Sequence, residues 1–192
     1  MRVIVGAHYD KVAKGHGVID NWTGASLLPS LFQSLHGHQR RLTFVFIGFT
    51  DEEVDLLGSR GYVRRLSEED KSKIFAMVNI DSLGLSETKV WLSLADKDLA
   101  SAAAKVAQAM NLPLSASDLD GIGLSDSMPF LDAKIPVIDF HSVTRKNISV
   151  LHSSRDNFRK LKIQEYVDSC NLLVAYLAYL DATLGVSSQP AK

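Results

Sequence analysis

The chain has 192 residues but only one cysteine, Cys170. A single cysteine excludes an internal disulfide and any zinc site built from several thiolates, and its place in a helical pattern predicts a small buried apolar residue. No run of about 18 apolar residues is present, so the sequence predicts no membrane span. No secretory leader precedes the first strand pattern, and we expect a cytoplasmic location for the chain as given.

The sequence also lacks an excess of either positive or negative charge. The formal net charge is −1, and the basic residues form no stripe beyond the pairs Arg40–Arg41 and Arg64–Arg65. Nucleic acid is therefore not an expected partner. The sequence has no Gly-x-Ser-x-Gly elbow and no phosphate-binding loop, which argues against a serine hydrolase and a P-loop enzyme.

Hydrophobic residues make up 46% of the chain, and no linker divides it. We predict one catalytic α/β domain over residues 1–184, followed by a disordered tail at 185–192. Strand patterns cover residues 2–7, 42–49, 74–80, 90–94 and 136–140, and helical patterns cover 22–35, 57–66, 99–110, 128–133 and 163–180. The alternation predicts a doubly wound, mostly parallel sheet flanked by helices, in which strand 42–49 is buried on both faces.

Metal-ligating residue types occur where these strand patterns stop. The candidates are His8, Asp20, Glu53, Asp81 and His152, with Glu52 beside Glu53. Parallel strands bring their carboxyl ends to one edge of a sheet, where ligand sites form. Imidazole and carboxylate are zinc ligands, and cobalt or manganese would tolerate the same set. Each motif alone has an ordinary reading as a turn, a helix cap or a solvated loop. Their joint occurrence at strand ends favours a paired metal site.

The same residues carry a family resemblance across nearly the whole chain. The motifs are Gly6-Ala7-His8-Tyr9-Asp10, Asp20-Asn21, Phe49-Thr50-Asp51-Glu52-Glu53, Val78-Asn79-Ile80-Asp81, Ser125-Asp126 before Pro129-Phe130, and Leu151-His152-Ser153 followed by Asp156. Their order and spacing resemble the co-catalytic zinc aminopeptidases of family M28, which include bacterial leucyl aminopeptidases. The resemblance implies a zinc-exopeptidase-like fold that is short at its N-terminus, because the chain begins only seven residues before His8.

The resemblance also implies a role for each residue. His8 and Asp81 would hold one zinc ion, Glu53 and His152 a second, and Asp20 would bridge the two. Glu52 would be the general base. Asp10 would accept a hydrogen bond from His8 and fix its tautomer, and Asp126 would support the ligands or the fold.

The implied function is a metal-dependent exopeptidase that removes N-terminal residues from peptide or aminoacyl substrates. Trp22, Met128, Phe130 and His141 are candidates for the substrate pocket, although His141 is also compatible with a core position. An exposed hydrophobic edge strand in the shortened sheet would favour a homodimer.

Three alternatives stay open at this point. One is a binding or scaffold protein that keeps the fold with an inactive site. Another is a single-zinc acyltransferase resembling glutaminyl cyclase, although His8 and Asp81 would be needed only by a second metal. A di-zinc carboxypeptidase or deacylase shares the ligand types, and spacing does not separate it from an aminopeptidase.

Overall fold

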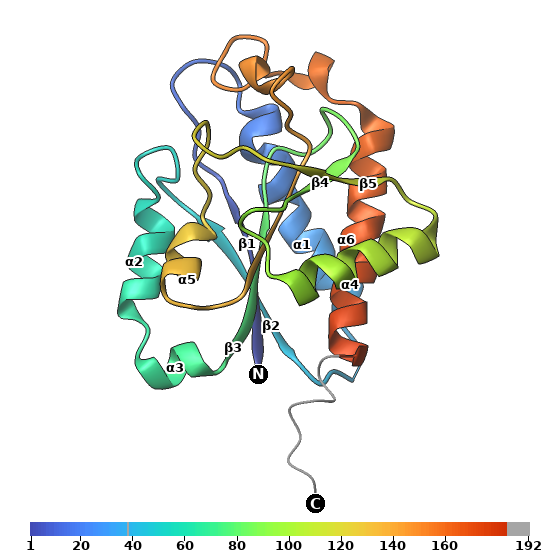
Figure 1. The fold of residues 1–192 in the computed structure, drawn as a ribbon. Helices are drawn as coiled ribbons and strands as arrows, with labels where there is room; N and C mark the ends of the chain where they lie inside the picture. The colour runs from blue at the N-terminus through green and yellow to red at the C-terminus, as the bar shows by residue number, and fades with distance from the viewer. Residues whose placement is uncertain (38, 184–192) are drawn as a thin grey trace, which may run out of the picture.

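The protein is described from a computed structural model that covers residues 1–37 and 39–183. Its centre is a six-stranded sheet in the order β2-β1-β3-β6-β4-β5 (Figure 1). The strands are β1 (Arg2–His8), β2 (Thr43–Phe49), β3 (Ile74–Ile80), β4 (Thr88–Trp91), β5 (Leu114–Ser117) and β6 (Val137–His141). All neighbouring strands are parallel except β4 and β6, which are antiparallel. The predicted fold class is confirmed.

Helices cover both faces of the sheet. Figure 1 shows α1 (Thr23–Leu35), α4 (Lys97–Met110) and α6 (Ile163–Thr183) on one face, and α2 (Leu57–Arg65), α3 (Glu68–Ser72) and α5 (Met128–Asp132) on the other. Short helical turns η1 (Val18–Trp22), η2 (Ile148–Val150) and η3 (Phe158–Lys160) lie in the connecting segments. Among the described residues, no helix combines the length and apolar character needed to cross a membrane.

Strand periodicity decides which side chains share a face. Odd-numbered residues of β1, from Val3 to Ala7, pack in the core beneath α1, α4 and α6, whereas Ile4 packs with Met77 and Phe130 on the opposite face. Successive side chains on a strand point to opposite faces, so His8 lies on the same face as Ile4, the face covered by α2 and α5. The site therefore forms at the carboxyl end of the sheet on this face.

Several local expectations were wrong. β2 is an edge strand whose central residues are only partly buried, because β1 is the one strand that pairs with it in the described part of the chain. β4 begins two residues earlier than predicted, and β5 was missed because its Leu-Ser-Ala-Ser sequence is short and weakly apolar. Cys170 is partly buried rather than buried. The predicted tail at 185–192 lies outside the described residues.

Candidate metal centre

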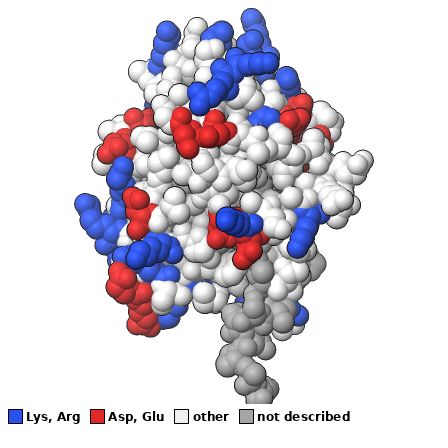
Figure 2. Space-filling view, in the orientation of Figure 1, with Lys and Arg blue, Asp and Glu red and all other residues white. Residues whose placement is uncertain are grey.

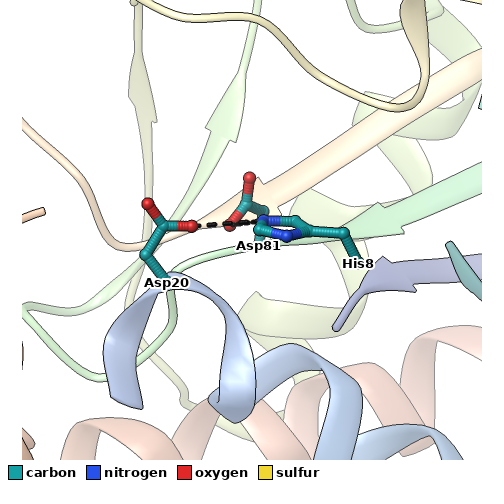
Figure 3. Close-up of side chains that lie close together, drawn as sticks. All are labelled: His8, Asp20 and Asp81. Carbon is teal, nitrogen blue, oxygen red and sulfur yellow. Dashed lines mark ion pairs between the residues drawn. The ribbon is translucent and has the colours of Figure 1, made fainter. Parts of the chain in front are cut away.

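Five predicted ligands lie together in two groups that share one aspartate. The first group is His8, Asp20 and Asp81, and the second is Asp20, Glu53 and His152; within each, the ligand atoms lie within 4.8 Å of one another. Figure 3 shows His8, Asp20 and Asp81 pointing toward one another from β1, η1 and the end of β3. The two groups therefore have the arrangement that a pair of bridged metal ions requires.

The shared aspartate uses a different oxygen for each group. Oδ1 of Asp20 lies 3.1 Å from Nε2 of His8, and Oδ2 lies 3.0 Å from Nε2 of His152. His152 Nε2 also lies 2.9 Å from Oε2 of Glu53, while His8 Nε2 lies 3.6 Å from Oδ1 of Asp81. A carboxylate with its two oxygens facing two separate ligand sets is placed to bridge two cations.

The electrostatics of the centre fit divalent cations. Burial opposes a charge on His8, but Asp20 and Asp81 outweigh it and raise the pKa of His8 to about 12. Burial would raise the pKa of Asp20, yet His152 and His8 lower it to about 2. Oε1 of Glu53 is buried without a hydrogen-bond partner among the described residues. Three carboxylates beside two imidazoles thus form an excess of negative charge that cations would neutralise.

The strand-to-helix connection after Phe49 places the two glutamates. Asp10 accepts hydrogen bonds from the backbone N–H groups of Glu52 and Glu53, each at 3.2 Å. The backbone oxygen of Asp10 lies 3.2 Å from Nδ1 of His8, closer than its carboxylate, which lies at 3.5 Å. Asp10 therefore contacts the His8 ring through its main chain while its side chain holds the glutamate loop.

The segment that carries Asp20 is held by two residues whose roles the sequence did not reveal. The buried carboxylate of Asp156 accepts the N–H of Ile19 at 2.7 Å and the N–H of Asp20 at 3.3 Å. Asn21 donates its side-chain amide to the carbonyl of Ile80 at 2.9 Å. Asn21 and Asp156 were visible only as motif neighbours of Asp20 and His152, and the bond between Asp156 and Asp20 joins residues 136 positions apart in sequence.

A second polar network lies behind the ligands. Asp139 on β6 accepts hydrogen bonds from the hydroxyl groups of Ser125 and Ser127 and from the side-chain amide of Asn79. These contacts hold the turn that carries Asp126, which is fully buried and whose pKa burial raises to about 7. Asn79 and Ser125 were visible as parts of the quoted motifs, whereas Asp139 was visible only as an aspartate inside an otherwise apolar strand pattern.

A cavity of about 790 Å³ opens beside the candidate ligands. Asp20, Glu52, Glu53, Asp81 and His152 line one part of it, and its apolar walls include Trp91, Leu119, Met128, Val143 and Leu151. Figure 2 shows Lys and Arg at the top and around the margin of one face of the molecule, whose centre is largely uncharged.

Two of the four predicted pocket residues line this cavity, namely Met128 and His141. Trp22 does not. It is 48% exposed and packs edge-on against Phe158 in a separate hollow. Phe130 is fully buried in the core between the sheet and the α2 and α5 helices, where it packs against Phe49. The pocket expectation was therefore wrong for Trp22 and Phe130, because η1 turns the indole away and α5 points its phenyl ring into the core.

Comparisons with known proteins agree with the resemblance. Residues 1–178 match the model of Peptidase family M28. Leupeptin-inactivating enzyme 1 of Streptomyces exfoliatus is 30% identical over 137 residues, which cover 70% of this chain and 31% of that protein. Aminopeptidase YwaD of Bacillus subtilis is 37% identical over 87 residues, which cover 45% of this chain and 19% of that protein.

A solved structure gives the same result for the fold. BSAP, a zinc aminopeptidase from Bacillus subtilis, superposes with a TM-score of 0.82 at 26% identity, over 92% of this chain and 45% of that structure. Each match thus spans less than half the length of the relative. Because the family model covers nearly the whole chain, the chain belongs to Peptidase family M28.

Proposed function

We propose that this chain is a zinc-dependent aminopeptidase that hydrolyses the N-terminal peptide bond of peptides and aminoacyl amides. The observation that carries the proposal is the pair of ligand groups that share Asp20. Family membership and the similarity to a zinc aminopeptidase support the reaction class. Two zinc ions are the proposed cofactor, and cobalt or manganese suits the same ligands.

The proposed ligand assignment follows the two groups. His8 and Asp81 would hold one ion, Glu53 and His152 the other, and Asp20 both. When bound, such a pair supplies Lewis acidity that activates water near neutral pH and polarises a carbonyl group. The ligands would bring three negative charges to four positive ones, so the loaded centre keeps a net attraction for an anionic oxygen.

Glu52 is the proposed general base. It lines the cavity next to Glu53, and the bond from its N–H to Asp10 fixes the position of its backbone. Burial, reinforced by Asp81, raises the pKa of Glu52 to about 9, and divalent cations bound beside it would favour the ionised form that a general base needs at neutral pH. A carboxylate in this position would take a proton from the attacking water and deliver it to the leaving amine, which contributes roughly 10² to 10⁴ in rate.

The test compares the native chain with Glu52→Gln and with Glu68→Gln as the matched control, because Glu68 is exposed on α3. Zinc content is measured by mass spectrometry, and turnover is measured on a panel of aminoacyl anilides. We expect close to two zinc ions per chain in all three proteins, with turnover lost only in Glu52→Gln.

Other outcomes would replace the proposal. Absence of bound metal would favour a binding or scaffold protein with an inactive site. Full occupancy with hydrolysis of N-acylated rather than free N-terminal substrates would indicate a carboxypeptidase or deacylase. One zinc ion with cyclisation of N-terminal glutamine would indicate a glutaminyl-cyclase-like acyltransferase.

A further inference from the structure

His141 lines the same cavity as the candidate metal ligands and the apolar walls. It is the last residue of β6, which is flanked by β3, leading to Asp81, and by β4, which ends in Trp91. The His141 ring lies 6.5 Å from the Trp91 ring at an interplanar angle of 63°, and both residues line the cavity. His141 is only 4% exposed. The protein therefore buries an imidazole in the wall of the space that would receive the substrate.

One hydrogen bond defines the tautomer of this imidazole. The backbone N–H of Val143 donates to Nδ1 of His141 at 3.1 Å, so Nδ1 must offer its lone pair. Burial lowers the pKa of His141 to about 4, and the ring is neutral at physiological pH. The single ring proton is then on Nε2, which acts only as a donor.

That donor has no partner within the described part of the chain. Nε2 of His141 is buried and no described residue accepts a hydrogen bond from it. The His141 ring neighbours Trp91 and Val143, which belong to one apolar cluster with Leu119. A buried N–H that stays unpaired is unfavourable, so a substrate that supplies an acceptor gains binding free energy relative to one that does not.

We propose that Nε2–H of His141 recognises the side chain of the substrate's N-terminal residue, and that this pocket prefers a neutral side chain with an acceptor oxygen on an apolar stem. The proposal rests on the proposed aminopeptidase function. The apolar walls would pack against the stem of that side chain, and Nε2–H of His141 would donate a hydrogen bond to its oxygen. A carboxylate side chain lacks a cationic partner here, because the ammonium group of the neighbouring Lys89 is already bound to Glu87 at 3.0 Å and Ser115 at 2.8 Å.

The test uses two anilide substrates that differ by one atom. Norleucine has a four-carbon side chain, and O-methylhomoserine replaces one methylene of that chain with an ether oxygen, which accepts a hydrogen bond but does not donate one. For the native chain we expect kcat/KM to favour O-methylhomoserine by roughly three- to tenfold. The variant His141→Phe keeps a ring but removes the donor, and should lose this preference or reverse it.

The variant His141→Gln supplies the matched control, since its amide restores a donor and should recover part of the preference. An equal substrate ratio in the native chain and in His141→Phe would overturn the proposal. Glu68→Gln should keep the native ratio.

A binding measurement on the native chain separates this proposal from the proposed function. Nitrogen-15 resonances of the histidine rings are recorded while free O-methylhomoserine or free norleucine is added. We expect the Nε2–H signal of His141 to shift with the ether and to stay in place with norleucine. Lack of hydrolysis of either anilide would contradict the aminopeptidase function alone, whereas a His141 signal that neither amino acid moves would contradict the recognition role.

Discussion

Replacing Asp156 with alanine should weaken both the fold and the candidate metal centre. Asp156 is 2% exposed, and its carboxylate accepts one N–H at 2.7 Å, from Ile19, and another at 3.3 Å, from Asp20. A hydrogen bond to a charged group contributes about 1.5–3 kcal/mol, and the longer bond contributes less, so Asp156→Ala should lower the free energy of unfolding by about 3 kcal/mol. This is a large fraction of the stability of a typical domain.

The same substitution should act on zinc affinity, because the lost bonds orient the backbone that carries Asp20. Loss of a group that orients a metal ligand typically costs 10- to 100-fold in affinity. Urea denaturation measures the first effect, and competition with a chromophoric chelator measures the second. Asp156→Asn keeps one acceptor and should lie between native and Asp156→Ala in both assays.

The control for this series is Asp132→Ala, which removes an exposed carboxylate at the end of α5 and should change neither quantity. The reasoning fails if the free energy of unfolding of Asp156→Ala lies within about 1 kcal/mol of the native value and the variant binds zinc with native affinity. Destabilisation with unchanged zinc affinity would show that Asp156 supports the fold without orienting Asp20.

Three further predictions concern cations, pH and assembly. A chelator should lower the melting temperature by roughly 10 °C, since a ligand at a thousand times its Kd contributes about 4 kcal/mol; an unchanged melting temperature would contradict a preformed metal site. Because the pKa of His141 falls from 6.5 to about 4 on folding, the unfolded chain binds more protons between these values. The contribution of His141 to stability should therefore drop by about 3 kcal/mol as pH falls from 6.5 to 4, and the difference in unfolding free energy between the native chain and His141→Phe should change by that amount in urea titrations over this range. The partly exposed edge strand β2 should support a homodimer, and light scattering that reports a monomer at every concentration would refute this.

The central strands and the main helices could be predicted because their signals are local. The apolar runs that became β1, β3 and β6 and the helical periods that became α4 and α6 were located to within a few residues. The burial of β2 was mispredicted because an apolar run reads the same at the centre of a sheet and at its edge. Position in the sheet depends on which strands pair, and pairing is a long-range property.

The candidate ligands were predictable because each follows a strand or opens a helix, and parallel strand ends meet at one edge of the sheet. The roles of the residues that position the ligands were not predictable. Asp156 bonds to a segment 136 residues away, and Asp139 is a single polar residue in a strand pattern that is otherwise apolar. The prediction of the residues that line the pocket was correct for two of four, because the direction of a side chain also depends on the tertiary structure. Met128 and Phe130 are neighbours on one short helix, but only the first faces the cavity.

The sequence by itself determined the class of fold, the types of ligand and their order along the chain, because periodicity and residue chemistry are encoded locally. Only the tertiary structure decided that Asp20 faces both ligand groups, that Trp22 turns away from the cavity, and that His141 lies in the cavity wall with its Nδ1 accepting from Val143. Those features depend on side-chain direction and on hydrogen bonds between distant segments, which exist only after the strands have paired.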